Sequence, residues 1–169
     1  KEVLRRLEQS SANQARDAME HWQTLYGRDH YRYSRDEDRR IAYATALDPT
    51  SLAEMRSMIE RQADYHQVRL FDASPSTFLL IAVPTTVDAR RLFNNEQTGG
   101  IYEHHNRRLI ARDTGSSLRH ELVHAYHYAH MDQLGQRHPL WVQEGLATLH
   151  ESYVIDDDAS ITYLPNERH

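Results

Sequence analysis

The segment from Ser116 to Leu134 constrains the fold most, because its pattern predicts a helix with two histidines on one face. Spacings near three and four residues place four apolar side chains in one stripe: Leu118, Leu122, Ala125 and Ala129. His120 and His124 lie one turn apart, separated by only about 40° around the helix axis and roughly opposite this stripe. One face can therefore pack on a domain while the histidines face a cleft.

The two histidines belong to a His-Glu-x-x-His pattern in which Glu121 follows the first histidine. Imidazole nitrogens at this spacing can converge on a zinc ion at ~2.0–2.1 Å. Glu121 projects beside them, where its carboxylate can reach a water next to the metal. The chain has 12 histidines and no cysteine. Zinc would therefore need His and carboxylate ligands, and an accidental match of the pattern has a chance of about 5%.

A catalytic zinc site needs a third protein ligand, and two residues compete for that position. Glu144 lies on the next predicted helix, after breaks at Gly135 and Pro139 that allow the two helices to pack together. His130 matches the spacing of the metzincin pattern, but His127 stands where that pattern has glycine. Without the glycine the helix should continue and carry His130 about 9 Å beyond His124. We therefore expect Glu144 rather than His130.

The His-Glu-x-x-His pattern with the downstream segment Leu140–Ala147 (LWVQEGLA) resembles the gluzincin zinc metallopeptidases, and most closely the peptidase MA-like group. The resemblance covers residues 117–151. It implies hydrolysis of peptide bonds, with one Zn²⁺ per chain. The implied roles are His120, His124 and Glu144 as zinc ligands and Glu121 as general base.

The resemblance also implies a Tyr or His that hydrogen-bonds the oxyanion of the reaction. Tyr153 and Tyr163 are candidates by position. Glu151, seven residues after Glu144, could support a ligand histidine, and His127 is a second candidate for that role. Each of these four side chains has a purely structural alternative. The expected partner is a peptide or protein substrate, and the alternative function is a degenerate gluzincin domain that binds a peptide or partner without cleaving it.

We expect an α+β fold in which a small mixed or antiparallel sheet packs with helices, and the histidine helix precedes the helix that carries Glu144. The chain is interpreted as one catalytic domain, residues 1–169. Its parts are an N-terminal packing helix (1–27), an α/β part with an edge hairpin (28–115), the zinc-binding helix pair (116–155) and a tail (156–169).

Local patterns predict the individual elements. Helices are expected at 1–26, from a cap at Ser51 to about Val68, after Thr86, after a cap at Ser116 or Ser117, and from Pro139 to near Val154. Strands are expected at 41–47, 77–83, 101–104 and 108–112. At 41–47 a helix is the alternative, because the alanines favour it. The charged run 34–40 is expected to be a solvated turn, and the tail from Asp156 an exposed loop.

Composition excludes some classes of protein. The net charge is −5 and the arginines are scattered among acidic residues, which argues against nucleic-acid binding. No apolar run reaches the ~18 residues of a membrane span. The chain begins with Lys1, which favours a processed or trimmed protein; the cellular location stays open, with a lean towards an extracytoplasmic or secreted protein. The oligomeric state also stays open.

Overall fold

A computed structural model describes residues 2–156 and 160–164, with side chains from Asn13 onward. The fold is α+β, as predicted. The helices are α1 (Glu2–Tyr26), α2 (Pro49–Tyr65), the π-helix η1 (His66–Phe71), α3 (Thr86–Leu92), α4 (Ser116–Leu134) and α5 (Leu140–Leu149). The strands are β1 (Arg32–Asp36), β2 (Ile41–Thr45), β3 (Leu79–Val83), β4 (Gly100–Glu103), β5 (Arg108–Ala111), β6 (Tyr153–Ile155) and β7 (Ile161–Tyr163).

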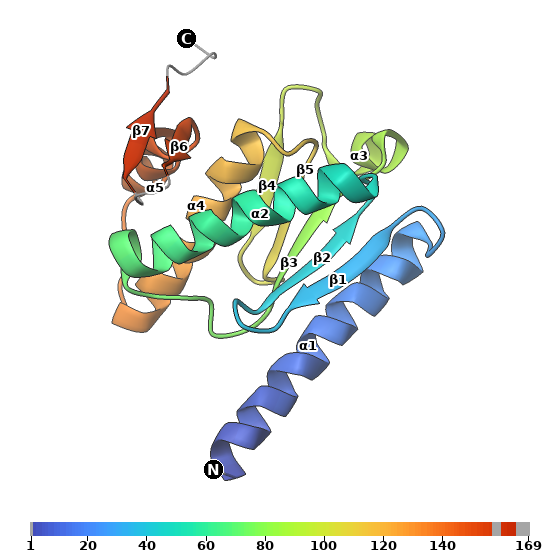
Figure 1. Cartoon of the computed structure of the whole chain (residues 1–169), viewed down its shortest axis with the longest axis horizontal. Helices are drawn as coiled ribbons and strands as arrows, with labels where there is room; N and C mark the ends of the chain where they lie inside the picture. Colours follow the sequence, from blue (N-terminus) through green and yellow to red (C-terminus); the bar gives the residue numbers. More distant parts are fainter. Residues whose placement is uncertain (1, 157–159, 165–169) are drawn as a thin grey trace.

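The main sheet is mixed, with strand order β1-β2-β3-β5-β4 (Figure 1). β2, β3 and β5 run parallel, and the antiparallel strands β1 and β4 form its two edges. β6 and β7 form a separate antiparallel hairpin beside α5. The predicted edge hairpin is therefore β4–β5, and β4 is its outer strand.

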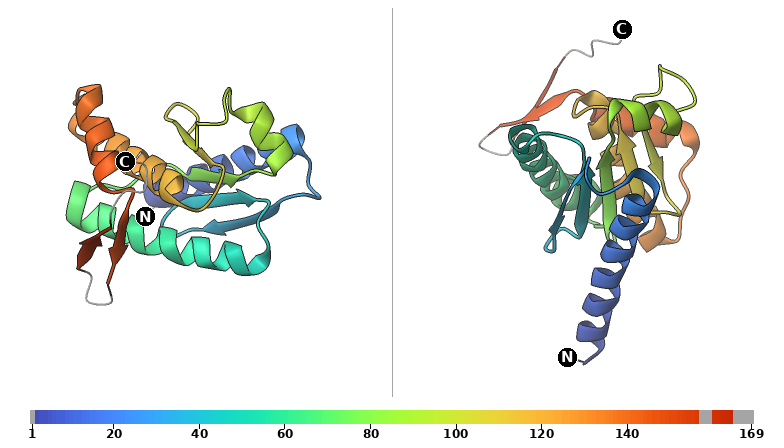
Figure 2. Two further views of the ribbon diagram at one scale, coloured as in Figure 1. Left: turned by 90° about the horizontal axis from the view of Figure 1, so that it is seen from above. Right: turned by 90° about the vertical axis from the view of Figure 1, so that its right-hand side faces the viewer.

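Helices cover both faces of the sheet (Figure 2). On one face, α2 and α4 pack on side chains from β2, β3 and β5. On the other face, Trp22 of α1 and Phe93 beside α3 pack on alternate residues of the same strands. The N-terminal part of α1 extends beyond the sheet (Figures 1 and 2). Strands that are buried on both faces read as continuous apolar runs, which is why 77–83 was recognisable from sequence.

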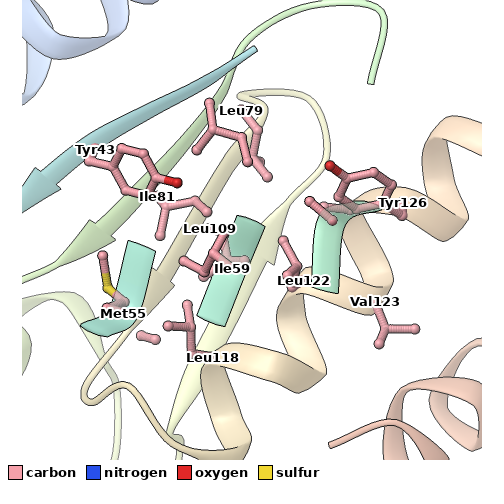
Figure 3. Close-up of a cluster of buried hydrophobic side chains, with 14 of the residues drawn as sticks. Tyr43, Met55, Ile59, Leu79, Ile81, Leu109, Leu118, Leu122, Val123 and Tyr126 are labelled. Atoms are coloured by element: carbon pink, nitrogen blue, oxygen red, sulfur yellow. The ribbon is translucent and has the colours of Figure 1, made fainter. Parts of the chain in front are cut away.

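The apolar stripe of α4 is buried as predicted. Leu118, Leu122 and Ala125 are fully buried, and Ala129 is nearly so. Figure 3 shows Leu118 and Leu122 directed towards Leu109 of β5 and Ile59 of α2. This packing fixes the rotation of α4 about its own axis and leaves the histidine face outside the core.

Several helix boundaries differ from the predictions. α2 begins at Pro49, not after Ser51, because the Asp48 carboxylate caps it by accepting hydrogen bonds from the backbone N–H groups of Thr50 and Ser51. Its α-helical part ends at Tyr65 and continues as η1.

The cap predictions at two further helices were also one residue or more out of place. Thr85 rather than Thr86 caps α3, since its hydroxyl accepts from Asp88 N–H. Gly115 occupies the N-cap position of α4, in place of Ser116 or Ser117.

Three segments that were predicted as turn, helix or loop contain strands, although residues 37–40 do form the predicted turn. The charged run 34–40 is strand through Asp36, since β1 pairs with the buried strand β2 and exposes its charges at the sheet edge. Helix α5 ends at Leu149, well before Val154, and Tyr153–Ile155 is strand. Part of the predicted tail is the strand Ile161–Tyr163, whose β-branched and aromatic residues suit a hairpin. The rest of that tail prediction, residues 157–159 and 165–169, lies outside the described residues.

Among the described residues, no helix has both the length and the apolar character needed to cross a bilayer. This agrees with the absence of a long apolar run in the sequence.

A buried aromatic cluster joins η1 to the segment that follows α5. His66 is fully buried, its Nε2 lies 3.4 Å from the Tyr153 hydroxyl, and its ring packs beside Phe71, Tyr126 and His150. Burial lowers the pKa of His66 to about 3, because the charged imidazolium would lose its hydration. His66 is therefore neutral in the folded protein at pH 7.

Truncation of the α4 stripe should destabilise the fold. We expect Leu122→Ala to lower the free energy of unfolding by about 2–5 kcal/mol, because it leaves a cavity between α4 and the sheet. Leu134→Ala, at an exposed position on the same helix, should change it by less than about 0.5 kcal/mol. Urea denaturation followed by circular dichroism measures both. Equal effects would contradict the packing described for α4.

The buried neutral His66 should make stability depend on pH. An unfolded histidine titrates near ~6.5, whereas the pKa of folded His66 is about 3. The unfolded chain therefore binds the extra proton, and stability falls as the pH drops from about 6.5 towards 3, by up to ~1.4 kcal/mol per pH unit from this residue. His66→Phe should remove that part of the slope in urea denaturation of metal-free protein between pH 7 and 5. His105→Phe, at an exposed position, is the control. An unchanged slope in His66→Phe would show that His66 is not the buried neutral group.

Candidate metal site

Helices α4 and α5 bring three potential metal ligands together. His120 Nε2 lies 3.2 Å from His124 Nε2 and 3.3 Å from Glu144 Oε2, and His124 Nε2 lies 3.5 Å from Glu144 Oε1. The two histidines are one turn apart on α4, and Glu144 comes from α5, which packs against α4. One atom from each residue thus forms a compact triangle of nitrogen and oxygen donors.

The size of this triangle fits a tetrahedral metal ion. Ligand atoms at ~2.0–2.1 Å from a tetrahedral ion stand about 3.3 Å from one another. The separations of 3.2 Å between the two Nε2 atoms and 3.3 Å from His120 Nε2 to Glu144 Oε2 lie close to that value, and the second carboxylate oxygen, Glu144 Oε1, lies 3.5 Å from His124 Nε2. Two histidines and a carboxylate are also a donor set that zinc accepts, with a fourth position left for water or substrate.

The hydrogen bond from His120 to Glu151 fixes which nitrogen of the His120 ring can bind a cation. His120 Nδ1 lies 2.9 Å from Glu151 Oε2, and because an ionised carboxylate only accepts, Nδ1 carries the proton. In the neutral ring His120 Nε2 then holds a lone pair directed at Glu144. Burial, helped by neighbouring His120, lowers the pKa of His124, so this ring also favours its neutral form.

Glu151 is well placed to orient His120. Its side chain is only 3% exposed, and its backbone carbonyl accepts a hydrogen bond of 2.6 Å from Arg119 Nε. The carboxylate is thereby held on the side of His120 away from the ligand triangle. A carboxylate that accepts from the non-ligating nitrogen fixes the tautomer and the ring orientation of a metal-binding histidine.

Glu121 lines the same cavity but does not belong to the ligand triangle. Burial, as the largest cause, raises the pKa of Glu121 to about 7; His120 and a hydrogen bond from the Tyr102 backbone N–H act against the rise, and Glu144 adds to it. β4 lies very close to this side chain, since a Cβ at Gly100 would stand 2.7 Å from Glu121 Cγ. Glycine at position 100 therefore allows the backbone of β4 to pack against Glu121.

The ligands open into a cavity of about 290 Å³ between β4, α4 and α5. Its lining adds several residues to the ligands and Glu121: Gly100, Ile101, Tyr102, Tyr128, Leu140 and Gln143. Sequence reasoning missed this lining. Tyr128 follows His124 by four residues on the same helix face, a spacing that could have identified it, whereas Tyr102 reaches the cavity only through the position of the hairpin.

The loop between α4 and α5 is fixed by a histidine pair. His127 Nε2 lies 2.7 Å from His138 Nδ1, and the His127 ring stacks on Phe71 with centroids 5.2 Å apart. Burial and the nearby histidines lower the pKa of His127 to about 4, so the ring is neutral. Gln143 Nε2 donates to the His138 carbonyl at 2.6 Å. These bonds tie the start of α5, and with it Glu144, to α4.

The structure places the other predicted site residues away from the ligand triangle. Tyr153 is buried with its hydroxyl towards His66, and Tyr163 is half exposed beside His150. Neither lines the cavity of the ligands. His127 bonds to His138 rather than to a ligand. His130, the alternative third ligand, packs near Phe71 and His138 on an unbroken α4.

Comparisons of the chain with models of protein families, with curated proteins and with solved structures found no match. The function of the chain is therefore inferred from the geometry of this site and from the sequence motif.

Removal of Glu144 should weaken zinc binding much more than removal of His130. We expect Glu151→Gln to lower the affinity for Zn²⁺ by about 10–100-fold, as is typical for the loss of a partner that orients a ligand. Glu144→Ala should cost more than this, because it removes a donor, and His130→Ala should have no effect. Competition with a chromophoric chelator measures each affinity. Loss of binding in His130→Ala with retention in Glu144→Ala would exclude the triangle as the zinc site.

Proposed function

We propose that the chain is a zinc-dependent peptidase of the gluzincin type. The observation that carries the proposal is the triangle of His120, His124 and Glu144 at the spacing of a tetrahedral ion, with the Glu121 carboxylate in the same cavity. Zinc bound there would polarise the carbonyl of a peptide bond and acidify a water molecule. The resemblance in sequence supports the same conclusion independently of these distances.

Glu121 is the group that would move protons. Its pKa of about 7 lies near neutral pH, where a carboxyl group both accepts and releases a proton readily. The carboxylate would take the proton of the water that attacks the peptide carbonyl and then deliver it to the departing amine nitrogen. The Tyr102 backbone N–H holds the carboxylate, and β4 next to Gly100 limits its movement.

Strand β4 offers a backbone that an extended substrate could pair with. The bond of 2.9 Å from Arg112 N–H to the Gly99 carbonyl fixes which residues of β4 pair with β5. By the alternation of antiparallel pairs, the backbone polar groups of Gly100 and Tyr102 face away from β5. The Tyr102 N–H is donated to Glu121, so a paired peptide would use the Gly100 groups and the Tyr102 carbonyl. A peptide added along this edge would lie beside the ligand triangle, as in other cases of strand addition to a sheet edge.

The rival function is a degenerate domain that binds peptides without cleaving them. The complete set of His120, Glu121, His124 and Glu144 in one cavity favours the enzyme, because peptide binding alone does not need a carboxyl group beside the metal ligands. Among the described residues the cluster offers three ligands, which favours this proposal over a structural zinc site, because four protein ligands usually close such a site.

The peptidase proposal predicts that Glu121→Gln separates metal binding from catalysis. We expect this variant to keep one zinc per chain and to lose about 10²–10⁴-fold in kcat/KM, the range that general base catalysis contributes. Glu60→Gln on α2 is the matched control and should retain activity. Zinc content by atomic absorption and cleavage of a quenched fluorescent peptide library measure the two properties. Native protein that holds zinc but cleaves no peptide in the library would overturn the proposal.

A further inference from the structure

A second cavity lies between the end of α2, η1 and the β6–β7 hairpin. Figure 2 shows this hairpin beside the junction of α2 and η1. The cavity has a volume of about 610 Å³, which is within the range for small-ligand sites and about twice the volume of the cavity at the ligand triangle. Five of its lining residues come from α2 and η1, and the other two are Ile155 and Asp156 at the end of β6. None of them lines the cavity of the metal ligands.

The continuous helix of α2 and η1 carries two arginines and a tyrosine along one face. Arg61, Tyr65 and Arg69 follow one another at intervals of four residues, which places them in a row, and all three line the cavity. The row crosses the boundary between α2 and the π-helix η1. Turns of π-helix are rare and occur frequently at functional sites. One face of this helix therefore presents two guanidinium groups to the cavity, with an aromatic ring between them.

The two guanidinium groups have no acidic partner in the described part of the chain. Arg69 forms no hydrogen bond or ion pair there, and Arg61 donates only to Ser57 Oγ, at 2.8 Å. Asp64, which also lines the cavity, is already bound by Arg39 through two hydrogen bonds of 2.8 and 2.7 Å. A guanidinium group has several N–H donors in a planar fork that matches carboxylate and phosphate groups. Arg61 and Arg69 therefore keep donors available for an anion in the cavity.

Asp156, on the hairpin side of the cavity, does not neutralise these arginines. Its Oδ2 accepts hydrogen bonds from Thr162 Oγ1 at 2.8 Å and from Ser160 Oγ at 3.3 Å, both within its own hairpin. Within the described residues, no ion pair joins it to α2 or η1. Its negative charge repels a second anion. An anionic group in the cavity would therefore lie against the helix and away from the hairpin.

The rest of the lining can contact an apolar group. Val68 is 70% exposed, and Ile155 of β6 is partly buried. The Tyr65 ring is held by its neighbours, since its centroid lies 6.2 Å from that of Tyr153 and 6.4 Å from that of His150. A surface that is ordered before binding loses little entropy when a ligand packs on it. An apolar group beside the anion would therefore remove the Val68 side chain from water at a small entropic cost.

We propose that this cavity binds a small organic anion, with its carboxylate or phosphate group at Arg69 and Arg61 and its apolar body against Tyr65 and Val68. About 12 Å separate the two arginines along the helix axis, and both side chains are long enough to reach one anion between them. The C-terminal carboxylate of a short peptide and a phosphate ester share this chemistry. The site contains no residue of the ligand triangle, so the inference holds whether or not the chain cleaves peptides.

NMR titration of the isotopically labelled chain, in the presence of zinc, would locate the ligand. The probes are N-acetylphenylalanine, its neutral amide, phenyl phosphate and inorganic phosphate. We expect saturable shifts of backbone signals in η1 and at the end of β6, and an affinity for the acid at least about 5-fold higher than for the amide, because only the acid pairs with arginine. Phenyl phosphate should bind more tightly than inorganic phosphate, which has no apolar body. The tighter of the two organic anions identifies the anionic group, and either order supports the site.

Two variants test the arginines directly. Arg69→Gln should weaken the binding of N-acetylphenylalanine about 5-fold or more, and Arg61→Gln should weaken it several-fold, because each change removes a charged donor. Both side chains are exposed, so neither change should disturb the fold. Arg90→Gln is the matched control. It removes the same charge from an exposed position of α3, outside the cavity, and should leave the affinity unchanged.

Three kinds of result would overturn the inference. Shifts confined to α4 and α5 would show that the anion binds at the metal ligands instead. Equal affinities for the acid and the amide, or an equal loss of affinity in Arg69→Gln and Arg90→Gln, would show that the arginines of the cavity do not recognise an anion. An absence of saturable binding for every probe would exclude the site. All three leave the peptidase proposal to its own test, which measures zinc content and cleavage.

Discussion

The packing of α4 on the sheet is the constraint on which the rest of the site depends. Leu118, Leu122 and Ala125 are fully buried against β5 and α2, so α4 cannot rotate without exposing apolar surface to water. Its histidines are consequently held about half a turn away, on the side of β4 and α5. The orientation of the two histidines is therefore set before any ion binds, because rotation of α4 would cost the free energy of its buried apolar face.

The second helix of the site depends on polar contacts as well as on the packing of Ala147 and Leu146 against the core. α5 is short, and its outward face carries the exposed residues Leu140, Trp141 and Glu144. Two hydrogen bonds of the preceding loop hold the start of α5: one joins His127 to His138, and the other runs from Gln143 to the His138 carbonyl. Glu144 is 50% exposed, so its carboxylate depends on this anchoring and on the ligand histidines for its place. The histidines of the described chain therefore differ in their surroundings: some are potential metal ligands, some anchor the loop and one is a buried packing group.

The β4–β5 hairpin completes the site by approaching α4 closely. Glycine at position 100 lets the backbone lie against Glu121, and the Tyr102 N–H binds the carboxylate. Burial between this strand and the helix raises the pKa of Glu121. The same strand contributes Ile101 and Tyr102 to the cavity. The edge strand β4 therefore holds the Glu121 carboxylate, forms the outer edge of the sheet and lines part of the cavity.

The sequence alone determined the elements and residues whose signals are local. The spacing of Leu118, Leu122 and Ala125 predicted the buried face of α4, and the apolar run before Pro84 predicted β3, since periodicity reports burial directly. His120, Glu121, His124 and Glu144 were identified from their spacing, and the structure brings them together. The short strands β1 and β7 were missed, because a strand forms only when it pairs with another segment. The cap at Asp48 was missed, because the nearby Ser51 has the same capping chemistry.

Only the tertiary structure decided which other groups reach the site. Tyr153 and Tyr163 follow α5 in sequence but pack beside His66 and His150, whereas Tyr102 and Tyr128 line the cavity. Glu151 supports His120 because the chain after α5 returns beside α4. Sequence spacing specifies neighbours within one helix. Contacts between a hairpin, a loop and two helices depend on how their apolar faces pack, and that packing is set by the whole fold.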